Sequence, residues 1–248
     1  MAILNLTPDS FHAPSRSTAE QAGERIRELL EQGADMIDIG AVSTRPGASH
    51  VDRETEWSRL EPVLKAYDGS YALSIDTTDS EIVRRAFDTV GPFMVNDISA
   101  GEHDIAMLPT VGRLGLGYIA MHKRGNPQTM DSHTGYENGV MSELLSYFRD
   151  FELRAVEAGI SDWVIDPGLG FAKTHEQNWE ILEHLRELKV LGRRILVGAA
   201  DKRFTCGDTE KAHRLAIRNG ADILRVHDVR SALLSVEDCR DDVAVSLL

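Results

Sequence analysis

Polar side chains that could bind a ligand stand in this sequence at the ends of short apolar segments. Asp76 ends "YALSID", Asn96 lies in "FMVND", and Asp166 follows "WVI". Two carboxylates and an amide supply several hydrogen-bond acceptors and one amide donor, which suits a flat, nitrogen-rich heterocycle that carries N–H groups. The three residues therefore predict a pocket for a ring of this kind.

A second group of side chains offers hydrogen-bond donors and positive charge. It consists of Asn5, Arg45, Arg225 and His227. Guanidinium groups bind phosphate oxygens through paired hydrogen bonds, so this group predicts a site for phosphate or pyrophosphate. The sequence thus indicates a ligand with a ring at one end and an anion at the other.

The segments that position these residues alternate regularly along the chain. Short apolar, β-branched stretches predict eight strands, at 2–6, 36–40, 71–76, 93–97, 116–121, 163–168, 194–198 and 222–226. Amphipathic patterns with polar caps predict helices between them, at 17–33, 56–67, 79–91, 141–159, 175–188 and 208–220. Single alternation implies a parallel sheet with right-handed crossovers, and eight repeats favour closure. We expect an α/β fold, a single (β/α)8 TIM barrel, in one domain over residues 1–248.

Active sites of such barrels lie at the carboxyl ends of the strands. Nearly all of the predicted strands carry polar residues there. One Asp at a strand end has a plainer explanation, because it often caps a helix or a turn, but so many polar ends favour a common pocket. For His122, after the fifth strand, two interpretations stay open: a pocket residue, or a hydrogen-bonded histidine of the core.

The composition disfavours several classes of protein. Charged residues make up 27% of the 248 residues and hydrophobic residues 42%, as in ordinary soluble globular proteins. No apolar run approaches the roughly 20 residues that cross a bilayer, and no basic leader precedes the first motif, so we expect a cytoplasmic protein without membrane contact. The formal charge of −13 disfavours nucleic acid as the main partner. Cys206 and Cys239 are expected to be reduced thiols.

The polar residues lie in blocks that resemble those of the dihydropteroate synthase family. The blocks occur in the family's order along most of the chain: "LNLTPDSF" (4–11), "IDIGAVSTRPGA" (37–48), "SIDT" (74–77), "NDIS" (96–99), "MHKRGNPQTM" (121–130), "DPGLGFAKT" (166–174) and "RVHDV" (225–229). The resemblance implies a (β/α)8 transferase of folate synthesis, which condenses 6-hydroxymethyl-7,8-dihydropterin pyrophosphate with p-aminobenzoate. It also implies Mg²⁺ as a cofactor, small-molecule substrates and, as an open expectation, a homodimer.

The resemblance further implies a role for each matching residue. The pterin would be bound by Asp76, Asn96, Met121, Asp166, Lys202 and Arg225. The pyrophosphate would be held by Asn5, Arg45, Arg225 and His227, with Asn5 also a ligand of Mg²⁺. The p-aminobenzoate pocket would be formed by Thr44, Pro46, Phe171 and Arg203. The catalytic residues would be Arg45, Asp166, Lys202, Arg225 and His227.

The stretch "AADKRFTCG", from Ala199 to Gly207, departs from the family pattern. Ala200 stands where the family usually has Ser, and Asp201 stands where it has Arg. A hydroxyl is therefore lost and a charge is reversed. Asp201 either pairs with nearby bases on a solvated loop or points inward, where it would repel an anionic substrate.

Other departures are Val42 in place of a Glu, Lys123 in place of a Met, and a shortened interval from Lys202 to Arg225. Two main functional interpretations follow: a working dihydropteroate synthase, or a divergent pterin-binding paralogue without that activity. A non-catalytic binding protein and another pterin-barrel activity, such as methyl transfer to a corrinoid partner, are further alternatives.

Overall fold

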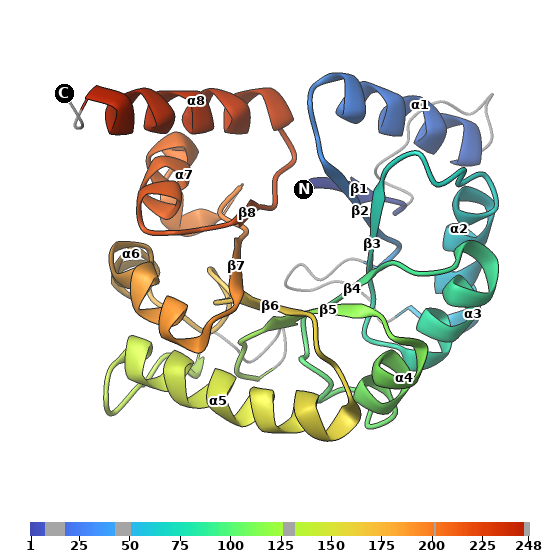
Figure 1. The fold of residues 1–248 in the computed structure, drawn as a ribbon, viewed down its shortest axis with the longest axis horizontal. Coiled ribbons are helices and arrows are strands. Elements are labelled where there is room, and N and C mark those ends of the chain that lie inside the picture. The colour runs from blue at the N-terminus through green and yellow to red at the C-terminus, as the bar shows by residue number, and fades with distance from the viewer. Residues whose placement is uncertain (8–17, 43–50, 126–131, 201, 246–248) are drawn as a thin grey trace. The chain divides into compact units, whose positions relative to one another are not determined.

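The computed structural model of the chain describes residues 1–7, 18–42, 51–125, 132–200 and 202–245. In this part of the chain, eight strands are neighbours in sequence order (Figure 1). They are β1 (Ala2–Asn5), β2 (Met36–Gly40), β3 (Ala72–Asp76), β4 (Met94–Asp97), β5 (Gly117–Met121), β6 (Trp163–Asp166), β7 (Arg194–Val197) and β8 (Ile223–Leu224). The pairs with a defined register are parallel. The eight predicted strands are confirmed, and β8 is shorter than predicted.

Helices separate consecutive strands. They are α1 (Thr18–Glu31), α2 (Arg53–Leu64), α3 (Ser80–Val90), α4 (Met107–Leu114), α5 (Val140–Ala158), α6 (His175–His184), α7 (Thr209–Arg218) and α8 (Val229–Val245), with 3-10 helices η3 (Leu185–Leu191) and η4 (Arg203–Thr205). In the described residues, no helix combines the length and the apolar character needed to cross a membrane. The six predicted helices are confirmed, with shifted ends.

Neither α4 nor α8 is predicted from the sequence. Helix α4 is short, contains Pro109 and Gly112, and has no side-chain hydrogen bond at its N-cap, Ala106. The usual signal for a helix start is therefore missing from the sequence. By contrast, α6 begins with a capping box in which Thr174 Oγ1 accepts from Gln177 N (3.2 Å) and Gln177 Oε1 accepts from Thr174 N (2.8 Å).

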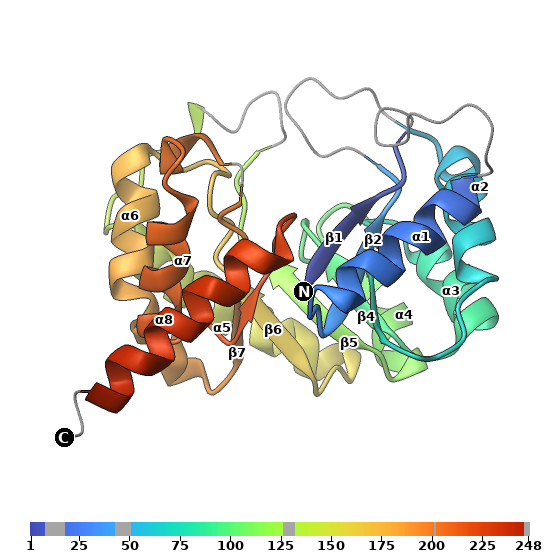
Figure 2. The same cartoon turned by 90° about the horizontal axis from the view of Figure 1, so that it is seen from above.

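The chain forms two compact units, and each has its own core. Unit 1 comprises residues 1–120 and 151–163. In it, α1 packs on α2, α2 on α3, and α3 on α4 (Figures 1 and 2). Strand residues such as Ile37, Ile39, Ile75 and Val95 are at most 1% exposed. Burial on both faces explains why these strands read as nearly continuous apolar runs.

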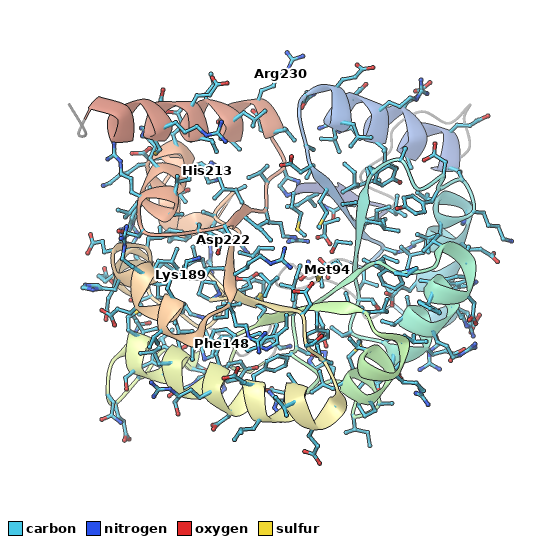
Figure 3. All side chains as sticks on the ribbon, viewed as in Figure 1. Met94, Phe148, Lys189, His213, Asp222 and Arg230 are labelled. Carbon is cyan, nitrogen blue, oxygen red and sulfur yellow. The ribbon has the colours of Figure 1, made fainter. Side chains whose placement is uncertain are left out.

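Unit 2 comprises residues 121–150 and 164–248. Its helix α7 packs on both α6 and α8 (Figure 2). Asp222, just before β8, pairs with Lys189 of η3 and accepts a 2.7 Å hydrogen bond from Ile195 N of β7 (Figure 3). This carboxylate therefore joins three elements at the amino ends of the last two strands.

Helix α4 lies very close to the end of α5 within unit 1. A Cβ added at Gly112 would lie 1.7 Å from the carbonyl oxygen of Ala158. That neighbour is backbone, which cannot move aside as a side chain can. Only glycine fits at this position.

We predict that Gly112→Ala lowers the free energy of unfolding by about 2 kcal/mol or more, because the added methyl group overpacks this contact. Gly23→Ala is the matched control, since Gly23 lies inside α1 and its Cβ would meet nothing within 4 Å. The control should be neutral or stabilising by up to about 1 kcal/mol. Urea unfolding of both variants measures the difference, and equal midpoints would contradict the prediction.

Candidate active site

The register of unit 1 sets three predicted residues in one row at the carboxyl ends of the strands. Asn5 is opposite Gly40, Gly40 is opposite Asp76, and Asp76 is opposite Asn96. Gly40 leaves space in this row, because a Cβ there would lie 3.3 Å from Asp76 Cβ. The structure thus brings Asn5, Asp76 and Asn96 to the same edge of the sheet, as the strand ends predict.

A buried carboxylate, which the sequence analysis does not single out, orients Asn96. Asp38 of β2 is 0% exposed, and it accepts hydrogen bonds from Ser74 Oγ (2.6 Å) and Asn96 Nδ2 (3.0 Å). Because the amide nitrogen of Asn96 donates to Asp38, the amide oxygen is the group that Asn96 can present to an N–H donor. The one signal in the sequence is an acid inside the apolar run "MIDIG".

The neighbouring acid Asp97 has a structural role. Its carboxylate accepts hydrogen bonds from Ser99 N (2.7 Å), Ser99 Oγ (2.6 Å), Gly101 N (2.9 Å) and Tyr118 Oη (2.5 Å). These bonds hold the turn after β4, where Ala100 and Gly101 have positive φ. For Asp97, the plainer explanation of a polar strand end is correct.

In unit 2, Asp166 ends β6 and is 8% exposed. Burial raises the pKa of this carboxyl group, while the Gly168 amide, 2.8 Å from Oδ1, and the charges of Arg225 and Lys202 oppose the rise. Both cations therefore act on Asp166 through the electrostatic field of the site. The structure brings together three residues that the sequence analysis assigns to catalysis.

Lys202 follows β7 and contacts the loop after β6. Its Nζ is 4.3 Å from the centroid of the Phe171 ring, a distance typical of a cation–π interaction. A Cβ at Gly170 would lie 3.1 Å from Lys202 Cδ, so the glycine leaves room for the lysine stem. The resemblance assigns Lys202 to the pterin and Phe171 to p-aminobenzoate, and the two side chains are neighbours.

Other predicted residues of unit 2 stand at the same strand ends. Met121 ends β5 and is 3% exposed, and Arg225 N donates to Val197 O (2.9 Å) directly after β8. His227 is half-buried, and Arg203 is exposed at the start of η4. Their predicted contacts with a substrate stay predictions.

Four predicted residues lie outside the described part of the chain: Thr44, Arg45, Pro46 and Asp201. Their roles also stay predictions, and the orientation of Asp201 is among them. Of the departures from the family pattern, Ala200 and Val42 are half-buried, whereas Lys123 is 8% exposed.

His122 is a buried, hydrogen-bonded histidine, which is one of the two interpretations left open by the sequence. It is 1% exposed, its ring meets Tyr147 edge-on at 4.9 Å between centroids, and its Nδ1 is 3.0 Å from Lys173 Nζ. Burial and, to a smaller extent, the positive charge of Lys173 together lower its pKa to about 2. The imidazole is therefore neutral, with Nδ1 as the acceptor and the proton on Nε2.

Lys173 is the second residue that the sequence analysis does not single out. It lies in "DPGLGFAKT" and is 9% exposed. Burial lowers its pKa to about 7, an effect that the negative charge of Asp166 opposes and the positive charges of Lys202 and Arg124 reinforce. The signal in the sequence is weak, because a lysine near a helix start commonly lies at the surface.

The sequence as a whole matches a known protein family. The chain belongs to the pterin binding enzymes, because the sequence pattern of that family matches residues 1–227. Two similar proteins are dihydropteroate synthases: that of Synechocystis sp. is 38% identical over 93% of this chain and 85% of the relative. That of Neisseria meningitidis serogroup C is 34% identical over 93% of this chain and 88% of the relative.

Other relatives are longer. The chain is 39% identical to the mitochondrial folate synthesis bifunctional protein of Arabidopsis thaliana and spans 47% of its length. It spans 34% of the folic acid synthesis protein fol1 of Pneumocystis carinii. The chain thus spans about half or less of the length of these two relatives.

Solved structures of dihydropteroate synthases share the fold. The enzyme of Yersinia pestis, in a complex with a sulfonamide drug, has a TM-score of 0.89 and 30% identity over 98% of this chain and 93% of that chain. The Xanthomonas albilineans enzyme with 4-aminobenzoic acid has a TM-score of 0.88 and 33% identity over 100% of this chain and 92% of that chain. Together with the strand order, this likeness confirms the predicted (β/α)8 TIM barrel fold.

The lowered pKa of Lys173 predicts a pH-dependent stability. Between pH 7 and about 10, the unfolded chain keeps this lysine protonated while the folded chain loses its proton, so the free energy of unfolding rises with pH. The slope should approach about 1.4 kcal/mol per pH unit for one proton. Below pH 7, both states are protonated and this contribution is flat.

Urea unfolding of the wild type and of Lys173→Met across this range isolates the effect, because the methionine variant should lack the slope. Lys65→Met is the matched control, since Lys65 is exposed and forms a surface ion pair with Glu61 of α2. Parallel pH profiles for the wild type and Lys173→Met would show that Lys173 stays protonated in the folded chain, which would contradict the prediction.

Proposed function

We propose that the chain is a cytoplasmic dihydropteroate synthase that condenses 6-hydroxymethyl-7,8-dihydropterin pyrophosphate with p-aminobenzoate, as one pterin-binding barrel domain. The observation that carries the proposal is a cluster of side chains in unit 2. The positive charges of Arg225 and Lys202 interact with the buried carboxyl group of Asp166, and Lys202 Nζ lies over the Phe171 ring. Support also comes from the relatives, which are named dihydropteroate synthases, and from one solved with pteroic acid.

The reaction is a displacement at the methylene carbon of the pterin. The arylamine nitrogen forms a bond to this carbon, the bond from the carbon to the pyrophosphate oxygen breaks, and the amine loses a proton. Negative charge builds on the leaving oxygens, so Arg45, Arg225 and His227 would contribute by electrostatic stabilisation. No covalent nucleophile is needed from the protein.

Hydrogen-bond acceptors at the strand ends would bind the pterin ring. Asp166 would accept N–H groups of the ring, and its negative charge would stabilise positive charge that the ring shares with the reacting carbon. In unit 1, Asp76 and Asn96 would do the same, with Asn96 turned by its bond to Asp38 so that its oxygen faces the ligand. Arg225 would stack on the ring face, and Met121 would pack beside it.

Phe171 and Arg203 would contact p-aminobenzoate, together with Thr44 and Pro46. Arg203 is exposed, and its guanidinium would contact the carboxylate of the substrate. Phe171 is half-buried and offers a ring face. An aromatic wall and a cation suit an arylamine acid.

Asn5 fits a Mg²⁺ ion that is held mainly by substrate oxygens. Mg²⁺ takes oxygen ligands, and proteins commonly bind it through one or two side chains plus phosphates of the substrate. Asn5 is half-buried at the end of β1, and the described residues contain no group of three or more His, Cys, Asp or Glu that could form a full cage. Bound there, Mg²⁺ would neutralise charge on the pyrophosphate.

The cysteines fit a reducing compartment. Both are free thiols, Cys206 exposed and Cys239 buried, as expected for a cytoplasmic protein.

A homodimer also belongs to the proposal. Helix α8 carries Leu234, which is 58% exposed and could contact a second chain. Sedimentation of the purified protein would give its mass.

The test of the proposal is pyrophosphate release from the pterin substrate and Mg²⁺, with and without p-aminobenzoate. Release that needs p-aminobenzoate, with dihydropteroate as the product, is the expected result. Binding of the pterin without product at high enzyme concentration would favour the divergent paralogue instead. Ala200 and Asp201 motivate that alternative, and recovery of activity in Asp201→Arg would name the charge reversal as its cause.

We also predict that Asp38→Asn lowers kcat/KM for the pterin substrate by roughly tenfold or more, about 1.4 kcal/mol, with little change in KM for p-aminobenzoate. The reason is that an amide at 38 presents a donor to the Asn96 amide and lets it turn. Asp97→Asn is the control: it removes an acceptor from the turn after β4 and should lower stability without this selective effect. Equal losses for both substrates in Asp38→Asn would contradict the prediction.

A further inference from the structure

Lys173 has a buried ammonium group that the proposed reaction does not use. Its Nζ lies 3.0 Å from Gly168 O, 3.0 Å from Phe171 O and 3.0 Å from His122 Nδ1, and 3.4 Å from His122 O. An ammonium group has three N–H donors and no acceptor, so these four acceptors satisfy it completely. The partners belong to two segments, the end of β5 and the loop after β6.

The loop from Pro167 to Ala172 depends on contacts with other segments to keep its conformation. It lacks the regular backbone hydrogen bonds of a strand or helix, and Gly168, Gly170 and Ala172 have φ of 67°, 77° and 51°. Positive φ at a residue with a Cβ costs roughly 1 kcal/mol or more, so the surrounding contacts must hold Ala172 in place.

The loop also approaches the end of β5 very closely. A Cβ at Gly168 would lie 2.0 Å from His122 O. The carbonyl oxygens of Gly168, Phe171 and His122 all lie within 3.4 Å of Lys173 Nζ. Without a cation between them, their partial negative charges would repel each other. Below its pKa of about 7, Lys173 carries a positive charge between them, and this charge turns the repulsion into attraction.

Asp166 depends much less on this fastening than Phe171 does. Asp166 belongs to β6, its carbonyl oxygen accepts from His122 N (3.0 Å), and its side chain accepts from Gly168 N (2.8 Å). Phe171 lies in the middle of the loop, and its carbonyl oxygen is one of the direct acceptors of the ammonium group. Loss of the ammonium should therefore displace the Phe171 ring and leave the strand residue in place.

We propose that Lys173 is a positioning residue that fastens the loop from Pro167 to Ala172 to the end of β5 and thereby holds the Phe171 ring in place for p-aminobenzoate. The substrate part of this inference rests on the proposed function. The fastening itself rests only on the contacts of Nζ. The two parts therefore fail separately.

The kinetic test compares Lys173→Met with the wild type at about pH 6, where Lys173 keeps its proton. Methionine matches the lysine stem in length and apolar character but has no donor. We expect KM for p-aminobenzoate to rise roughly tenfold, and kcat and KM for the pterin substrate to change by less than about threefold. Lys173→Arg keeps a charged donor and should recover part of the affinity for p-aminobenzoate.

The result that would overturn the proposal is a fall of kcat with an unchanged ratio of the two KM values, because a merely structural role lowers the amount of folded enzyme for both substrates. Identical behaviour of Lys173→Arg and Lys173→Met would also overturn it. Lys65→Met, at the exposed residue directly after α2, is the control for the loss of a lysine and should match the wild type.

Hydrogen exchange tests the fastening without any activity. Two of the hydrogen-bonded loop amides lie away from β6: Gly170 N donates to Asn178 Oδ1 (2.7 Å) and Phe171 N donates to Gly168 O (3.1 Å). In Lys173→Met, these amides should exchange at least about tenfold faster, while amides inside α6 should keep their wild-type rates. Unchanged exchange in the loop would refute the proposal even if the enzyme is an active synthase.

Tyr136→Phe tests the same loop if Lys173→Met fails to fold. Tyr136 Oη donates to Ala172 O (2.9 Å), so this variant removes a second tie to the loop and keeps the ring. It should raise loop exchange and KM for p-aminobenzoate in the same direction, by a smaller factor. If the wild type makes no dihydropteroate, the proposed function fails, and faster loop exchange in the variants would still establish the fastening.

Discussion

Backbone hydrogen bonds between parallel strands fix the register of the strand ends, and the candidate site in each unit depends on that register. In unit 1 it sets Asn5, Gly40, Asp76 and Asn96 in one row. In unit 2 the bond from His122 N to Asp166 O joins the residue after β5 to the last residue of β6. A slip of one residue would turn every side chain of a strand to the opposite face, so chemistry and folding are specified by the same ladder.

Each unit also buries an ionisable group directly behind a residue that the proposed function assigns to a substrate. In unit 1, Asp38 stands behind Asn96, and in unit 2, Lys173 stands behind the backbone of Phe171. A buried charge without partners is costly. Because each of these charges needs its neighbours in one geometry, the neighbours inherit a fixed orientation, which is how a ligand-facing side chain becomes preorganised.

Much of the fold is visible in the sequence because its signals are local. Apolar runs predict the strands, caps such as Asp79 and Thr174 mark helix starts, and polar residues at strand ends indicate the site. The sequence does not show α4, whose formation depends on packing against α3 rather than on caps. Nor does it show the roles of Asp38 and Lys173, whose partners Asn96 and His122 lie far away along the chain.

The two cysteines differ sharply in their access to solvent, since Cys206 is exposed and Cys239 is 3% exposed. Cys206 follows η4, in the same loop as Lys202 and Arg203. A thiol-reactive fluorophore would therefore attach at this one place in the folded protein, with no engineered cysteine. The native chain offers a ready optical reporter for events at the end of β7.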